Sequence, residues 1–221
     1  MRIRRVACTA VLVVSLAGCA APSARQYYTL MPEAYPNGVS AGAGAPARQV
    51  PVVARPYAIN VRPVSLPEQV DRPQIVISSP GSSQVIPLND SLWASPLSDE
   101  IRNALANDLA RQLGVLDISA RGAPEGLPLW KISLTVQRFD SVFNERVVLD
   151  GTWRLAPVNQ PDQSIRICRA EVSIAAEPGV SGLVSGHQRA LRQLASVIAS
   201  QISGNAYAVE KSALTMKGCT T

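Results

Sequence analysis

The sequence predicts an α/β fold of the α+β kind: a two-layer sandwich in which a mostly antiparallel mixed sheet is packed by two amphipathic helices. Two long segments, 96–113 and 181–203, carry apolar residues at helical spacing. Several shorter segments alternate apolar with polar residues, as strands buried on one face do. A sheet and two helices that each have a single apolar face bury those faces by packing together.

The first 18 residues are expected to be a lipoprotein signal peptide. Three arginines within residues 1–5 precede an apolar run, 6–16, which at about 11 residues is too short to span a bilayer, since a spanning helix needs roughly 20. The run ends in Leu-Ala-Gly-Cys at 16–19, which resembles the lipobox of bacterial lipoproteins. Cleavage before Cys19 would leave this cysteine to take the lipid. An ordinary signal peptide with a chance cysteine is the alternative.

Lipid attachment at Cys19 predicts a membrane anchor. One acyl chain holds a protein only marginally, at roughly 0.8 kcal/mol per buried CH₂. The resemblance to lipoproteins implies more than one chain, palmitate among them, and therefore lasting attachment to membrane lipid. The next residue is Ala20, not the aspartate that resembles an inner-membrane retention signal in enteric bacteria. We therefore expect an outer-membrane anchor with the protein on the periplasmic face.

The remaining chain is long enough to bury a core, and we expect three parts. They are a tether at 19–54, a globular domain at 55–205 and a C-terminal tail at 206–221. Within the tether, the Ala-, Gly- and Pro-rich stretch 31–51 cannot bury enough apolar surface to offset its ordering entropy, so a mobile loop is predicted. Tyr27 and Tyr28 precede it, either as a short docked strand or as an exposed aromatic handle.

Short apolar or alternating runs predict the strands. They lie at 57–62, 75–77, 84–86, 115–119, 130–136, 146–156 and 164–175. The Ser-Pro-Gly-Ser sequence at 79–82 is a turn signal between the second and third runs. A turn at 157–163 makes the last two runs expected antiparallel neighbours.

The first helix is the clearest element. Ser95 is expected as its N-cap and Pro96 as its first helical residue, with Asp99 and Glu100 in the first turn, where the helix dipole favours negative charge. Its apolar stripe consists of Leu97, Ile101, Leu105, Leu109 and Leu113, and Gly114 is placed to end it. The apolar face of the second helix consists of Val184, Leu191, Leu194, Ala195, Ile198 and Ile202.

Charge and cysteine content limit the function classes. Without the three arginines of the signal peptide, 18 basic residues face 16 acidic ones, a net charge of about +2, and no basic stripe is present, so we expect no nucleic-acid partner. Cys168 and Cys219 remain after Cys8 leaves and Cys19 is lipidated. In an oxidising periplasm they are plausible disulfide partners. The alternative is one buried free thiol and one in a frayed tail.

Three sequence features together resemble a known family. They are Tyr-Tyr-Thr-Leu at 27–30 soon after the lipobox, Leu-Pro-Glu-Gln-Val-Asp-Arg-Pro-Gln-Ile-Val at 66–76, and Leu-Trp-Ala-Ser-Pro-Leu at 92–97. The set resembles the PqiC/YmbA family, the auxiliary lipoproteins of ABC-type and MCE-type lipid transport systems. The likeness runs from Tyr27 to the second helix. The loop 31–51 looks like an insertion, and the tail with Cys219 has no counterpart in the family pattern.

The resemblance implies a non-enzymatic component of a lipid transport system that maintains envelope integrity. Its expected partners are an MCE-type periplasm-spanning protein and, through it, an inner-membrane transporter. Assembly with further copies of the same chain, as a homo-oligomer, is an alternative that the sequence leaves open. Two rivals remain, an envelope hydrolase acting on lipid or peptidoglycan and an unrelated periplasmic assembly factor. For the hydrolase, the carboxylates to consider are Asp140, Glu145 and Asp150.

Candidate interface residues come from the same segments. Asp71-Arg72 lies between two prolines and is either a loop-shaping ion pair or part of a partner interface. Trp93 either packs onto the first helix as a hydrophobic staple or contacts a partner.

The sequence contains no histidine constellation, no paired-carboxylate motif and no cofactor motif. The only histidine, His187, has no evident partner nearby in sequence and is expected to be a solvated helix residue rather than a catalytic base. One histidine and two distant cysteines give no metal-ligand spacing, and no phosphate-loop motif is present, so no metal or cofactor is expected.

Overall fold

The computed structural model describes residues 24–31, 56–118, 122–210 and 212–220. One sheet contains eight strands in the order β1-β4-β3-β5-β6-β7-β8, with β2 paired to the start of β5. The strands are β1 (Gln26–Tyr28), β2 (Ala58–Val61), β3 (Gln74–Ser78), β4 (Val85–Trp93), β5 (Leu129–Val142), β6 (Arg146–Val158), β7 (Arg166–Ala175) and β8 (Leu214–Thr220). The pairings β3–β4, β5–β6, β6–β7 and β7–β8 are antiparallel, whereas β1–β4, β2–β5 and β3–β5 are parallel. The predicted mostly antiparallel mixed sheet is confirmed.

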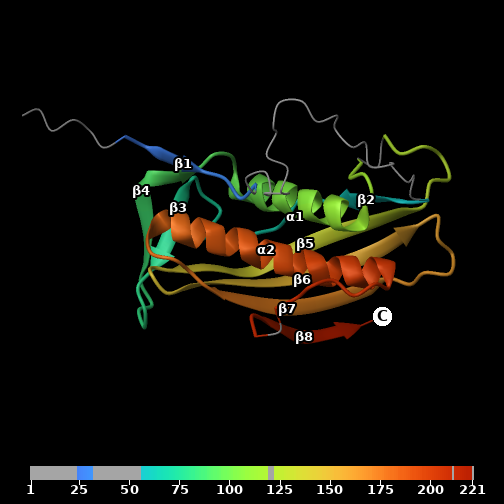
Figure 1. Cartoon of the computed structure of the whole chain (residues 1–221). Helices are drawn as coiled ribbons and strands as arrows, with labels where there is room; N and C mark the ends of the chain where they lie inside the picture. The colour runs from blue at the N-terminus through green and yellow to red at the C-terminus, as the bar shows by residue number, and fades with distance from the viewer. Residues whose placement is uncertain (1–23, 32–55, 119–121, 211, 221) are drawn as a thin grey trace, which may run out of the picture.

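Two helices, α1 (Leu97–Leu113) and α2 (Gly179–Ser203), cover one face of this sheet and pack against each other (Figure 1). All five residues of the predicted α1 stripe are at most 2% exposed, and Gly114 ends the helix at φ 64°. In β5, the predicted alternation also holds, since Trp130, Ile132, Leu134 and Val136 are buried. The two-layer sandwich is therefore confirmed. No helix in the described part of the chain is long and apolar enough to cross a membrane.

The α1 stripe gives a direct test of the layer packing. Leu105 is 0% exposed, so Leu105→Ala should lower the free energy of unfolding by about 3 kcal/mol through lost apolar contact and a residual cavity. Asn103→Ala, on the exposed side of α1, is the matched control and should change stability by no more than about 0.5 kcal/mol. Chemical denaturation measures both. Equal stability of the two variants would show that the stripe does not face the core.

The predicted strand at 115–119 is wrong. Among the described residues of this segment, only Asp117 makes a ladder contact, an isolated bridge to Ile59. Residues 119–121 lie outside the described part of the chain. The Asp117 carboxylate accepts hydrogen bonds from the backbone N–H of Val61 at 2.9 Å and from Arg102 at 2.5 Å. Because a side chain takes the place of a backbone acceptor here, the pairing does not continue as a ladder.

The predicted cap of α1 is also wrong. The helix begins at Leu97, Pro96 occupies the N-cap position, and no side chain caps the helix. The Ser95 hydroxyl instead donates to Glu100 Oε1 at 2.7 Å. Glu100 is buried and needs donors, so it recruits the serine that the sequence pattern assigned to the cap.

Two segments differ from expectation in length. The strand predicted at 84–86 runs on to Trp93, because pairing with both β3 and β1 satisfies the backbone of its polar second half. Residues 214–220 of the expected tail form β8 and extend the sheet beyond β7. The loop at 31–51, apart from Met31, and the expected anchor residues Cys19 and Ala20 lie outside the described residues.

Candidate partner-docking groove

The antiparallel pairing of β3 with β4 brings the candidate interface residues together. The loop that carries Asp71 and Arg72 leads into β3, and Trp93 ends β4, so the antiparallel register places them side by side. The backbone N–H of Trp93 donates to the Pro73 carbonyl at 2.8 Å. Together they line a groove of about 360 Å³, hereafter the Trp93 groove. Its lining residues are Asp71, Arg72, Pro73, Trp93, Ala94, Ser95, Pro96 and Leu97.

The rim and the floor of the Trp93 groove differ in chemistry. Asp71 and Arg72 are exposed, and within the described chain no salt bridge joins them. Backbone hydrogen bonds shape their loop instead: the N–H groups of Val70 and Asp71 donate to Pro67, at 3.1 and 3.2 Å. The charged groups therefore remain available to a partner.

Trp93 forms the floor and is mainly a core residue. It is 5% exposed and packs edge-on against Phe139 of β5, with ring centroids 6.2 Å apart. Its removal would disturb the core as well as the groove, so it is a poor probe of binding.

The N-terminal segment is fastened to the groove wall through Glu100. Glu100 Oε2 accepts hydrogen bonds from the Thr29 hydroxyl at 2.7 Å and the Leu30 N–H at 2.8 Å, while Oε1 accepts the bond from Ser95. Gln188 of α2 donates to the carbonyls of Thr29 and Met31. Sequence analysis missed this role of Glu100, since an acid in a first turn already has a sufficient explanation in the helix dipole.

Tyr27 and Tyr28 lie in β1, which pairs with the end of β4. The sequence left open a docked strand or an exposed aromatic handle, and the backbone of these residues forms the docked strand. The Tyr27 side chain is nevertheless 63% exposed, whereas Tyr28 packs against the core.

His187 is not solvated, contrary to expectation. It is 1% exposed, stacks on Phe139 with ring centroids 3.7 Å apart, and its Nε2 lies 2.9 Å from Ser141 Oγ. Burial lowers the pKa of His187 to about 3. Its Nδ1 has no hydrogen-bond partner among the described residues, so the third group that orients a catalytic base is missing from this serine–histidine pair. His187 is therefore a buried core residue that packs on Phe139.

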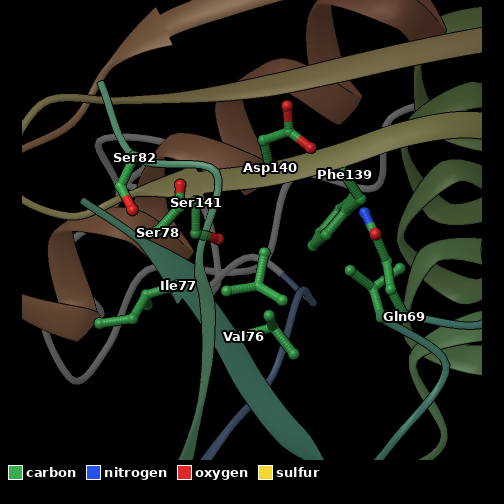
Figure 2. Close-up of a pocket in the computed structure, with 10 residues that line it drawn as sticks. Gln69, Val76, Ile77, Ser78, Ser82, Phe139, Asp140 and Ser141 are labelled. Carbon is green, nitrogen blue, oxygen red and sulfur yellow. The ribbon is translucent and has the colours of Figure 1, made fainter. Parts of the chain in front are cut away.

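Ser141 and Phe139 also line a cavity of about 160 Å³ between the end of β5 and the β3–β4 hairpin. Figure 2 shows Val76, Ile77 and Ser78 of β3 approaching it from the hairpin side. Asp140 lines the cavity as well, yet its carboxylate pairs with Arg138 at 2.5 Å.

The carboxylates considered for a hydrolase are all engaged by arginines. Asp150 is buried and accepts two hydrogen bonds from Arg169, at 2.8 and 2.7 Å. Glu145 pairs with its neighbour Arg146 in the turn between β5 and β6. These three carboxylates serve separate ion pairs. Among the described residues, no group of three or more histidine, cysteine or acidic side chains is arranged to hold a metal.

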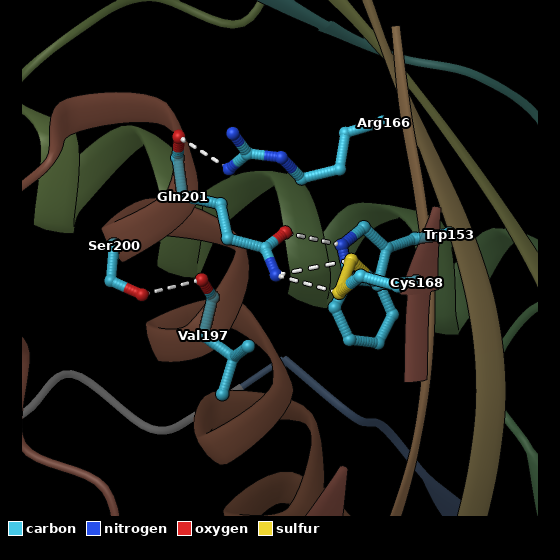
Figure 3. Close-up of a disulfide and its surroundings, with 7 residues drawn as sticks. Trp153, Arg166, Cys168, Val197, Ser200 and Gln201 are labelled. Carbon is cyan, nitrogen blue, oxygen red and sulfur yellow. Dashed lines mark hydrogen bonds between the residues drawn. A yellow bond between two sulfur atoms is a disulfide. The ribbon is translucent and has the colours of Figure 1, made fainter. Parts of the chain in front are cut away.

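Cys168 and Cys219 stand opposite each other in β7 and β8 and are joined in a disulfide. Figure 3 shows Gln201, from the last turn of α2, beside it: the Gln201 amide donates to Cys168 Sγ at 3.3 Å, and its oxygen accepts from the Trp153 indole at 2.8 Å. The disulfide thus fastens the edge strand next to the helix layer. Neither Gln201 nor its contacts had a signal in the sequence.

Comparison with known proteins gives a family match. The family model described as "ABC-type transport auxiliary lipoprotein component" matches residues 41–199. Two curated proteins described as "Intermembrane transport lipoprotein PqiC", from Escherichia coli (strain K12) and Shigella flexneri, are each 30% identical over 95 residues. These matches cover 43% of this chain and 49% of each relative, so the chain spans about half the length of the curated relatives.

Solved structures share the fold. A crystal structure of an uncharacterized protein aligns with a TM-score of 0.60 at 20% identity, covering 81% of this chain and 99% of that chain. A protein from Xanthomonas campestris aligns with a TM-score of 0.50 at 14% identity, covering 66% and 83% of the two chains. At these identities the likeness extends to the fold alone.

Proposed function

The chain belongs to the family of ABC-type transport auxiliary lipoprotein components, and from this we propose that it is a non-enzymatic, outer-membrane-anchored subunit of a lipid transport system. Its lipid is attached to Cys19. Its partner is an MCE-type periplasm-spanning protein, which connects it to an inner-membrane transporter, and the assembly maintains envelope integrity.

The Trp93 groove is the observation that carries the docking role. Its floor is apolar and its rim carries one exposed acid and one exposed arginine. Arginine is among the residue types most enriched in interface hot spots, and interfaces as a whole combine an apolar core with a polar rim. The groove therefore suits an apolar side chain of a partner flanked by opposite charges.

The size of the groove supports docking rather than lipid enclosure. About 360 Å³ falls at the low end of the roughly 300–1,000 Å³ range of ligand pockets. We therefore assign the lipid path to the assembly and not to this domain alone.

The hydrogen bonds of Glu100 connect the segment that follows the anchor with the wall of the Trp93 groove. The chain that follows Cys19 enters β1 and is held at Thr29 and Leu30 by Glu100, which also holds Ser95 on the groove wall. A partner seated in the groove would thus be held at a fixed distance from the strand nearest the anchor.

Arg72→Ala, alone and combined with Asp71→Ala, tests this proposal. Loss of a hot-spot side chain costs about 2 kcal/mol, so we expect about 30-fold weaker capture of the MCE-type partner in affinity purification, with an unchanged melting temperature. Arg154→Ala removes an exposed arginine from β6 and is the matched control.

Two outcomes would contradict the proposal. Full partner capture by the correctly folded Asp71→Ala, Arg72→Ala variant would show that the partner binds outside the Trp93 groove. A main partner from outside lipid transport would instead favour the unrelated assembly factor.

A further inference from the structure

The hairpin formed by β3 and β4 lies at one end of the sheet (Figure 1), and its tip, on the far side of Asp90 from β1, is uncharged and partly apolar. No charged residue occurs between Gln74 and Asn89, although 17% of the whole chain is charged. Val85 and Ile86 are 48% and 40% exposed. Exposed apolar residues on a hairpin invite aggregation unless another surface covers them. Val85 and Ile86 therefore offer an apolar surface that another apolar surface could cover.

Only a short length of chain separates the expected anchor, Cys19, from the strand β1 that pairs with this hairpin. From Cys19 to Gln26 the chain spans at most about 25 Å, at 3.3–3.6 Å per residue. The position of Gln26 is set by its pairing with Ser91 of β4. Val85 precedes Ser91 by six residues in the same strand, a span of about 20 Å. The lipid on Cys19 and the apolar surface of the hairpin can thus reach one bilayer together.

The opposite end of the sheet lies farther away. Trp130 of β5 pairs with Ile59, whereas Val142 of β5 contacts Ser78 of the hairpin. These two points are twelve residues apart in one strand, so about 40 Å separates the two ends of the sheet. Leu116, which is 73% exposed, lies beside Ile59 at that far end.

We propose that the β3–β4 hairpin and Tyr27 rest on the phospholipid surface that holds Cys19; the proposal depends on the lipid anchor of the proposed function. Val85 and Ile86 contact the boundary between headgroups and acyl chains. Tyr27, 63% exposed in β1, places an apolar ring with a polar tip at the headgroup level, where tyrosine is enriched. Because the hairpin carries no charged residue from Gln74 to Asn89, the contact made by Val85 and Ile86 is apolar and insensitive to salt. It orients the domain, with the hairpin end toward the membrane.

Two tryptophan variants of the full, lipidated protein test the orientation. Ile86→Trp places a probe on the hairpin, and Leu116→Trp is the matched control, an exposed apolar position at the far end. Each is reconstituted in vesicles of phosphatidylethanolamine and phosphatidylglycerol, with or without brominated acyl chains. The native residues Trp93, Trp130 and Trp153 are at most 6% exposed and give a constant background.

We expect the added emission of Ile86→Trp to shift to the blue and to be quenched by brominated lipid, since interfacial apolar groups sit about 5–10 Å into the boundary region. Leu116→Trp should show neither effect. Equal quenching of both variants, or of neither, would overturn the orientation.

Flotation of the same vesicles separates this inference from the anchor. If the protein floats with the vesicles and Ile86→Trp is not quenched, the hairpin contact is wrong while the anchor stands. If neither variant floats, the anchor fails and the inference fails with it. Because both substituted positions are exposed, melting temperatures equal to wild type should verify folding.

Discussion

Removal of the Cys168–Cys219 disulfide should lower the free energy of unfolding by about 4 kcal/mol. The two cysteines are 51 residues apart, and the chain-entropy model gives this value for a closed loop of that length. The bridge also holds β8, in which every residue after Leu214 is exposed, so little apolar burial would keep this strand in place without it.

Cys219→Ala is the cleaner variant, because Cys219 is exposed while Cys168 is 1% exposed. Replacing Cys219 therefore breaks the bridge without opening a core cavity. Denaturation of the full-length, periplasm-derived protein, with and without reductant, provides the measurement. Wild type should lose stability on reduction, and Cys219→Ala should not respond. Two reactive thiols per chain in the unreduced, denatured wild type would contradict the bridge.

Acidification should destabilise the protein through His187. Its pKa in the folded state is about 3, against about 6.5 in an unfolded chain. Above pH 6.5 the imidazole is neutral in both states and has no effect. As the pH falls below 6.5, only the unfolded chain binds the proton, so stability is lost progressively until the pH reaches about 3.

The loss attributable to His187 should be about 3 kcal/mol at pH 4.5 and about 5 kcal/mol for the full shift. His187→Gln keeps a group that can bond to Ser141 but does not titrate, so its stability should depend less on pH by that amount. The comparison uses the pH dependence of each variant, because glutamine also changes the stacking on Phe139. Parallel curves for the two proteins would exclude His187 as the cause.

Both helices could be predicted from the sequence because an apolar stripe is defined by residues three or four positions apart. The same helical spacing explains why the expectation of a solvated His187 was wrong. His187 lies three residues after Val184 and four before Leu191, and both of these residues are buried on the core face. Its contacts could not be predicted, because Ser141 lies 46 residues away on a strand.

The misassigned elements have a common physical reason: side chains that look local are recruited by distant ones. Ser95 and Glu100 suggested a cap and a dipole contact, but Thr29 and Leu30, some 70 residues away, complete a buried carboxylate site. Asp117 similarly takes the N–H of Val61 and prevents a regular strand. The grouping of Asp71, Arg72 and Trp93 depended on the β3–β4 register, which the apolar run at 84–86 was too short to predict.

Both the proposed docking role and the orientation of the hairpin depend on the anchor at Cys19. Metabolic labelling with palmitate, followed by membrane fractionation, tests that anchor in cells that produce wild type or Cys19→Ala. Wild type should incorporate the label, begin at residue 19 after maturation and fractionate with the outer membrane. Cys19→Ala should take up no label and remain an unprocessed precursor. Normal labelling and maturation of Cys19→Ala would contradict the account.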